Sequence, residues 1–141
     1  MGISPDSYLT LSSTGSHQLR NDSDIRISAI DIGSNSIRQT IADVSPTGVI
    51  RVVDEMKAAP RLGAGLDKNG RISDLAIQNA LSTLTRMATL ATQLGVKRTE
   101  VVATSAVREA SNGEQFLKQV KTETGLRPRV LRGEDEARLS F

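Results

Sequence analysis

The sequence predicts an α/β protein built on a mixed five-stranded sheet, and the order of its segments carries this prediction. Three strand-like segments come first, at residues 26–33, 36–44 and 49–58, separated by short turns. Helical and strand-like segments then alternate, so the order is β-β-β-α-β-α-β-α. Two hairpins followed by crossover units give antiparallel and parallel strands in one sheet, with helices on its faces.

Turn and cap residues mark the boundaries in the first half of the chain. Small residues at Gly33–Asn35 separate the first two strands, and Ser45-Pro46-Thr47-Gly48 separates the next two. A glycine-bearing loop at residues 61–70 then leads to Ser73, an N-cap that predicts a helix ending at Gly95. One buried face of this helix is predicted by apolar residues at three- and four-residue steps, namely Ile77, Leu81, Leu84, Ala88, Ala91 and Leu94.

The second half continues the alternation. A short buried strand is predicted at 100–104, a loop at Ser105–Asn112, and a helix at 113–124 that Gly125 ends. A fifth strand at about 128–132 ends at Gly133, and another helix begins at Glu134. This arrangement is ribonuclease-H-like.

Composition excludes several functional classes. Residues 1–24 are Ser-rich without an apolar period, so we expect a flexible tail and a folded body at 25–141. Aromatic residues make up 2% of the chain, which predicts a core of Ile, Val, Leu and Ala and argues against a stacking surface for single-stranded nucleic acid. A net charge of +2 is too small to indicate a surface for duplex nucleic acid.

Cysteine and histidine chemistry is equally restricted. The chain has no Cys and one His, His17 in the polar tail, so thiolate zinc sites, disulfides and a Ser-His-Asp triad are not expected. No apolar run is long enough to span a membrane, and no secretory signal is visible. We therefore expect a cytoplasmic protein without a membrane partner.

The run Ala29–Arg38 carries the clearest chemical signal. Asp31 interrupts an apolar strand at its end, where burial of a lone carboxylate would be costly. The small residues that follow form a tight turn rich in backbone N–H groups and hydroxyls, a pattern that suits a phosphate carrying a divalent cation. An ordinary hairpin whose Asn and Ser side chains satisfy the turn is the alternative interpretation.

Two further loops are expected beside this turn, because ligands bind at the carboxyl ends of strands in α/β sheets. The loop at 103–108 offers hydroxyls and Arg108, which suits an anionic substrate. The loop at 133–138 offers carboxylates that could deprotonate water. The alternatives are an ion pair of Arg108 with Glu109 or Glu114, and acidic residues that simply complement a helix N-terminus.

Four stretches together resemble the exopolyphosphatase / guanosine-pentaphosphate phosphohydrolase family, within the sugar kinase–heat-shock ATPase–actin superfamily. They follow the family's order and spacing over about residues 27–141. The stretches are Asp31–Ser36, Arg61–Leu66, Ala103–Ala106 with Arg108 and Asn112, and Gly133 with Asp135–Leu139.

This resemblance implies a phosphohydrolase that removes the terminal phosphate of polyphosphate or guanosine pentaphosphate and needs Mg²⁺ or another divalent cation. It implies Asp31 as the metal residue and Glu136 as the general base that activates water. The implied phosphate-binding residues are Gly33, Ser34, Asn35, Ser36, Ser105 and Arg108. It also implies an actin-like ATPase half-domain, and a homodimer is a candidate assembly for a full-length protein.

The chain departs from the family pattern at three places. Asp135 stands where Glu is usual, and Gln39-Thr40 replaces an apolar pair, which predicts an exposed edge for the second strand. A second phosphate loop, Asp-x-Gly-Gly-Gly-Ser, follows the fourth stretch in the family, whereas this chain ends at Phe141. We therefore expect an N-terminal fragment with little activity alone. A phosphotransferase of the same superfamily and a non-catalytic ligand-sensing module are the alternatives.

Overall fold

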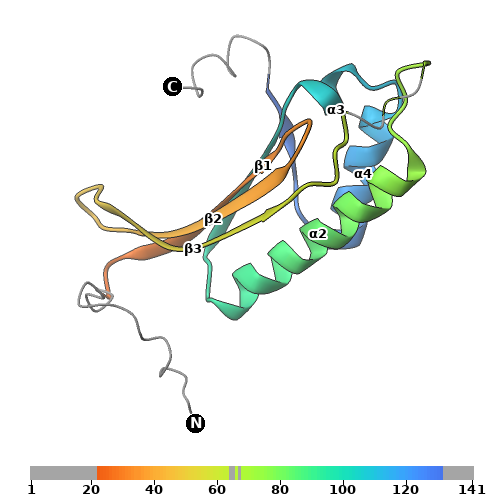
Figure 1. The fold of residues 1–141 in the computed structure, drawn as a ribbon. Coiled ribbons are helices and arrows are strands. Elements are labelled where there is room, and N and C mark those ends of the chain that lie inside the picture. Colours follow the sequence, from red (N-terminus) through yellow and green to blue (C-terminus); the bar gives the residue numbers. More distant parts are fainter. Residues whose placement is uncertain (1–21, 64–65, 67, 132–141) are drawn as a thin grey trace.

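The computed structural model describes residues 22–63, 66 and 68–131 of the 141-residue chain. Most of the expected tail at 1–24 lies outside these residues, as does the helix expected from Glu134. Within the described part, the chain forms one sheet with helices packed against it (Figure 1).

The sheet has five strands in the order β3-β2-β1-β4-β5. β1 pairs antiparallel with β2, and β2 with β3, while β4 is parallel to β1 and β5 is parallel to β4. The predicted mixed sheet of two hairpins and parallel crossovers is therefore confirmed. The strands are β1 (Ile25–Ile32), β2 (Ile37–Val44), β3 (Ile50–Ala58), β4 (Arg98–Ala103) and β5 (Arg129–Val130).

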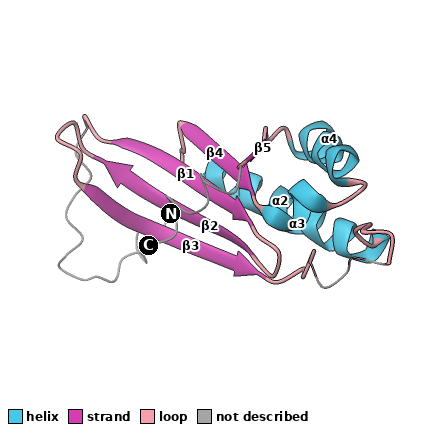
Figure 2. Ribbon diagram, turned by 90° about the horizontal axis from the view of Figure 1, so that it is seen from above, coloured by secondary structure: helices cyan, strands magenta, loops and turns pink. Residues whose placement is uncertain are grey.

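The described helices are α2 (Asp74–Gln93), α3 (Ser105–Glu109) and α4 (Gly113–Thr124). α2 runs along one face of the sheet (Figure 1), and the view from above shows all three helices toward the end at which β1 and β4 finish (Figure 2). No helix among the described residues combines the length and the apolar character needed to cross a lipid bilayer.

Local signals set the boundaries of α2 as the sequence predicts. The Ser73 side chain accepts a hydrogen bond of 3.1 Å from the N–H of Ala76, which caps the helix start. Gly95 adopts a φ of +72° just beyond the helix end, a conformation that residues with a Cβ rarely adopt. These two residues bound the helix, which connects β3 to the start of β4.

The core lies between the sheet and the helices. In β1 every second residue, Ser28, Ile30 and Ile32, is buried, so this face of the strand packs on the helices. The expected core of Ile, Val, Leu and Ala is incomplete, because Phe116 and Met87 are also fully buried. One aromatic ring on α4 and a flexible thioether on α2 thus fill space that smaller aliphatic side chains leave.

Two elements differ from the sequence prediction. The expected loop at 105–112 contains α3, a helix of five residues, so the order becomes β-β-β-α-β-α-α-β. The expected strand at 128–132 is reduced to the two residues of β5. Elements of this length carry too few residues for periodicity to indicate them.

The prediction of an exposed edge at Gln39-Thr40 is wrong. β2 lies inside the sheet between β3 and β1, and the Gln39 side chain is completely buried. Its Nε2 donates hydrogen bonds to Ser28 Oγ at 3.0 Å and to the Met87 carbonyl at 2.9 Å. Gln39 therefore links the second strand to the middle of α2.

Candidate active site

The carboxyl end of β1 is the place where the predicted loops meet. Ile32, the last residue of β1, accepts hydrogen bonds at its carbonyl oxygen from the Thr104 N–H at 3.0 Å and from Thr104 Oγ1 at 3.3 Å. The loop after β4 is thereby fixed to the strand that carries Asp31. This contact follows from the parallel pairing of β1 with β4, which brings both strand ends to one edge.

The turn after β1 is closed by its own backbone. The N–H of Gly33 donates to the Ser36 carbonyl at 2.9 Å, and β2 begins at the next residue. Asn35 is exposed, while Ser34 and Ser36 are half-buried. The turn therefore presents small polar side chains at the sheet edge, as the sequence predicts.

The glycine-bearing loop at 61–63 packs directly on this turn. The N–H of Gly63 donates to the Ser34 carbonyl at 2.8 Å, and the N–H of Arg61 donates to the Asn35 carbonyl at 3.2 Å. A Cβ placed on Gly63 would lie 2.9 Å from the Ser34 Cβ, closer than two carbon atoms can pack. Glycine at 63 thus allows the second loop to hold the first.

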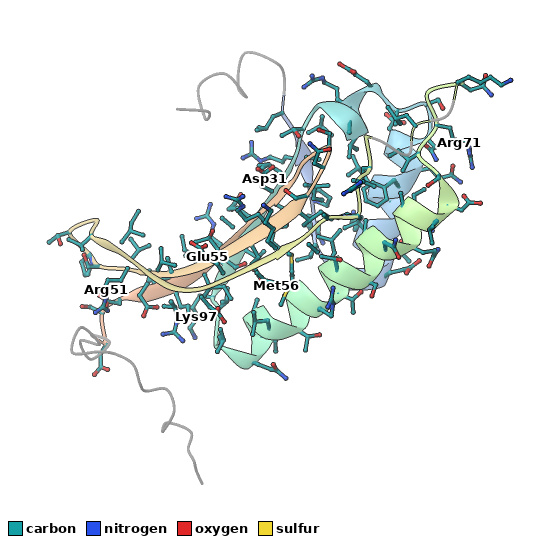
Figure 3. All side chains as sticks on the ribbon, in the orientation of Figure 1. Asp31, Arg51, Glu55, Met56, Arg71 and Lys97 are labelled. Atoms are coloured by element: carbon teal, nitrogen blue, oxygen red, sulfur yellow. The ribbon has the colours of Figure 1, made fainter. Side chains whose placement is uncertain are left out.

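Asp31 lies in the last two residues of β1, and its side chain is exposed. Figure 3 shows it at the end of the sheet near the turn. Its neighbour across the antiparallel ladder is Arg38, which is also exposed. Opposite charges at directly paired positions attract each other, so this end of the hairpin carries one carboxylate and one guanidinium.

The sequence prediction missed Arg38 at this site, and it gave Arg61 only as the first residue of the stretch Arg61–Leu66, without a role. The hairpin register around the turn could have indicated Arg38, because a turn at 33–36 places residue 38 opposite residue 31. Arg61 is different: its φ is +56°, an uncommon conformation for a residue with a side chain. No sequence signal indicates this backbone conformation.

Arg108 lies in α3, and groups of the protein contact its guanidinium. Nη1 donates a hydrogen bond of 2.8 Å to the Leu131 carbonyl, and Nη2 is 3.7 Å from Glu109 Oε2. The ion pair with Glu109 that the sequence offered as an alternative is thus present. A phosphate contact by Arg108 stays a prediction.

Of three further residues that the sequence singled out, the structure describes Ser105 and Asn112 but not Glu136. Ser105 begins α3 directly after Thr104, so its backbone lies at the same sheet edge. Glu136, together with the acidic loop at 133–138, lies outside the described residues. Asn112, part of the third stretch, is buried and exchanges two hydrogen bonds with the backbone of Ile72, at 2.9 and 3.1 Å. Its role is to anchor the loop before α2.

Metal binding at this edge has one candidate ligand among the described residues. No group of three or more acidic or histidine side chains comes together in residues 22–63, 66 and 68–131. Mg²⁺ commonly uses one or two carboxylates and completes its shell with water and substrate phosphate. An exposed aspartate beside a phosphate-type turn fits that requirement.

Comparisons with known proteins identify the family to which this sequence is similar. The sequence profile of the Ppx/GppA phosphatase family matches residues 40–141. Exopolyphosphatase 1 of Mycobacterium tuberculosis is 36% identical over 117 residues, which cover 83% of this chain and 34% of that protein. A guanosine-5'-triphosphate,3'-diphosphate pyrophosphatase of Photobacterium profundum is 32% identical over 113 residues, covering 80% of this chain and 22% of that protein.

Solved structures agree with the sequence matches. The Ppx/GppA family member of Aquifex aeolicus superposes with a TM-score of 0.77 at 36% identity, covering 82% of this chain and 37% of that one. An exopolyphosphatase from Cytophaga hutchinsonii gives a TM-score of 0.76 at 31% identity, covering 81% and 36%. These matches confirm the predicted family resemblance and the predicted ribonuclease-H-like fold class. The chain spans about a third of the length of these exopolyphosphatase relatives.

Proposed function

Because this chain belongs to the Ppx/GppA phosphatase family, we propose that it forms one wall of a phosphohydrolase active site. The proposed reaction removes the terminal phosphate of inorganic polyphosphate or of guanosine pentaphosphate. The observation that carries the proposal is the junction at the end of β1. There, backbone hydrogen bonds join the turn at 33–36 to the loop at 61–63 and join Thr104 to Ile32.

The turn would hold the terminal phosphate. Backbone N–H groups and the hydroxyls of Ser34 and Ser36 are donors suited to phosphate oxygens, with Gly33 and Asn35 shaping the same turn. Ser105 and Arg108 would contribute from the loop after β4. Backbone hydrogen bonds fix the loops that carry these groups, which limits the reorganisation that binding would require.

A divalent cation, Mg²⁺ or another of its kind, would be held by Asp31 together with substrate oxygens and water. When bound, it would neutralise the charge that develops on phosphate oxygens. The exposed carboxylate of Asp31 at the edge of the turn supports this assignment. Because Asp31 and the phosphate would bind the same cation, Asp31 would also orient the phosphate.

Glu136 would act as the general base. Its carboxylate would take a proton from a water molecule as the water oxygen bonds to the terminal phosphorus. The bond from that phosphorus to the bridging oxygen would break, and the shortened chain would leave. The assignment rests on the match of Glu136 to the fourth family stretch, which follows Leu131 by five residues in the sequence.

The proposal is tested with a chimaera in which this chain replaces the matching third of the Mycobacterium tuberculosis exopolyphosphatase. Phosphate release is measured separately from polyphosphate, guanosine pentaphosphate and ATP, with Mg²⁺ and with a chelator. We expect release from one or both of the first two substrates and its loss with chelator. Transfer from ATP to an added hydroxyl compound would favour a phosphotransferase, and binding without turnover would favour a sensing module.

The isolated chain provides the second arm of the test. We expect it to turn over substrate far more slowly than the chimaera, because a phosphate clamped from one side lacks the preorganised groups on the other. Tripolyphosphate should still shift the backbone amide signals of Ser34 and Ser36 in an NMR titration. Equal turnover by the chain and the chimaera would contradict the one-wall proposal.

A further inference from the structure

Leu131 is held at both of its backbone groups, by the last residue of β4 and by the short helix α3 that follows. Its N–H donates to the Ala103 carbonyl at 2.9 Å, and its carbonyl accepts from Arg108 Nη1 at 2.8 Å. Leu131 is buried, whereas Arg129 and Val130 of β5 are exposed. The exit of this two-residue strand therefore depends on residues 103–108.

The hydrogen bond from Arg108 to Leu131 has a charged donor that is partly shielded from water. The side chain is 30% exposed, so the guanidinium is partly shielded from water. A hydrogen bond from a charged donor is stronger than one between neutral groups, especially where water is partly excluded. A guanidinium also has five N–H donors, so a bond to one carbonyl is compatible with a bond to an anion.

We propose that Arg108 is a positioning residue that fixes the exit of β5 and couples this exit to an anion bound beside the turn. The proposal rests on the proposed function, which places phosphate at Arg108 and the base five residues after Leu131. One side chain would then hold both the substrate and the strand end from which the base-bearing segment departs. Occupancy by a phosphate would order the guanidinium and tighten its hold on Leu131.

Hydrogen exchange of the Leu131 amide in the whole chain tests this directly. Arg108→Met keeps a long side chain but removes every donor, and it should speed exchange at Leu131 by about tenfold or more. Arg108→Lys restores a charged donor and should recover most of the protection. Amides of Ile30 and Leu84, in the core of the sheet and α2, should not change and show that each variant is folded.

Glu109→Gln is the matched control. It removes the carboxylate 3.7 Å from Arg108 Nη2 without removing the donor to Leu131. We expect no change in Leu131 exchange. A change as large as that of Arg108→Met would assign the hold to the ion pair and overturn the proposal.

The coupling is tested with tripolyphosphate as the probe. It should slow Leu131 exchange in the unmodified chain and in Arg108→Lys, and have no effect in Arg108→Met. Unchanged Leu131 exchange in Arg108→Met would overturn the positioning role. Faster exchange in Arg108→Met, but no response of Leu131 to tripolyphosphate in the unmodified chain, would leave a purely structural bond and also overturn it. Failure of the proposed function shows separately, as an inactive chimaera and unmoved Ser34 and Ser36 amides.

Discussion

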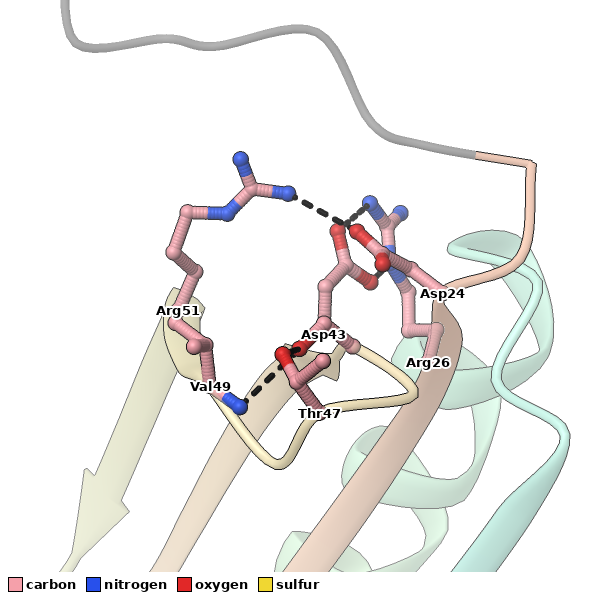
Figure 4. A network of polar contacts seen from close by, with 7 residues as sticks. Asp24, Arg26, Asp43, Thr47, Val49 and Arg51 are labelled. Atoms are coloured by element: carbon pink, nitrogen blue, oxygen red, sulfur yellow. Dashed lines mark hydrogen bonds and ion pairs between the residues drawn. The ribbon is translucent and has the colours of Figure 1, made fainter.

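The two ends of β1 use charge in opposite ways. At the amino end, Arg26 makes a two-pronged ion pair with Asp43, at 2.8 and 3.0 Å, and also donates to the Leu94 carbonyl at 3.0 Å. Arg51 contacts Asp24 beside it, at 3.1 Å (Figure 4). At the carboxyl end Asp31 is exposed, and the loops around it are joined through backbone groups.

Burial explains the difference. The Asp43 side chain is 5% exposed and that of Arg26 is 17% exposed. The hydrogen bond to Asp43 is the main cause that raises the pKa of Arg26 above its ordinary value. A raised pKa in the folded state means that this stabilisation is fully present at neutral pH and is lost only in strongly alkaline solution. Arg26 therefore keeps its charge around neutral pH, where the amino end acts as a structural clamp.

The contrast teaches how to separate structural charge from functional charge in this chain. A carboxylate that is buried, with both oxygens accepting hydrogen bonds from an arginine, stabilises the fold and cannot reach a ligand. A carboxylate that is exposed beside loops fixed by backbone bonds contributes little to stability and remains accessible to solutes. We therefore expect substitutions at the amino end to change the free energy of unfolding, and substitutions at the carboxyl end to change binding or rate.

The largest effect is expected for Glu136→Gln in the chimaera. Loss of a general base should lower kcat by about 10²–10⁴-fold, while KM changes much less because the amide is nearly isosteric. Steady-state kinetics with polyphosphate measure both constants, and a thermal melt checks that stability is unchanged. A raised KM with an unchanged kcat would make Glu136 a binding residue and remove it from the proposed chemistry.

Asp43→Ala in the isolated chain should give the next largest effect. Removing one partner of a buried pair leaves the other charge unpaired, which costs about 3–5 kcal/mol in the free energy of unfolding. The matched change Asp31→Ala, at the exposed end, should cost less than about 0.5 kcal/mol. Urea denaturation measures both. Similar losses for the two variants would show that burial does not separate the two ends.

The sequence predicted those features of the fold that depend on nearby residues. Ser73 and Gly95 bracket α2 because caps act within one turn, and the hairpin at 45–48 follows from its turn residues. Topology then predicted that Asp31 and Thr104 would reach one edge. These predictions needed only local chemistry and the general rule that strand ends meet.

Features set by distant partners were not predictable in the same way. Gln39 was expected on an exposed edge, but its burial depends on Met87, which lies 48 positions away. The bond from Arg108 to Leu131 spans 23 positions and involves a backbone carbonyl that has no sequence signature. Only packing decides which acceptor such a side chain meets.

Gly63→Ala tests the packing of the loop at 61–63 on the turn at the carboxyl end of β1. The added methyl group would clash with Ser34, and the strain should cost about 1–3 kcal/mol. Because the loop at 61–63 would be pushed off the turn, tripolyphosphate should no longer shift the Ser34 and Ser36 amides. Gly48→Ala, in the hairpin near the opposite end, is the control. Its φ of +89° makes it destabilising too, but it should leave those shifts intact.

The smallest effect is expected for Gln39, a buried polar side chain that lies between the two ends. Its amide nitrogen has two partners, but its buried Oε1 has none among the described groups. Gln39→Leu removes one unsatisfied oxygen, but it also takes the donor away from the buried Ser28 Oγ and from the Met87 carbonyl, so the net cost should be about 1 kcal/mol.

The double variant Ser28→Ala with Gln39→Leu isolates this balance, because it replaces both buried polar partners with apolar groups. We expect it to be as stable as the original chain or slightly more so, since neither side chain then needs a partner. Chemical denaturation of the two single variants and the double variant gives their coupling energy. A loss above about 3 kcal/mol for the double variant would mean that the Gln39 bond to Met87 holds α2 in place. The rule drawn from the amino end, that buried polar groups with bonded partners are the stabilising ones, would then extend to the middle of the sheet.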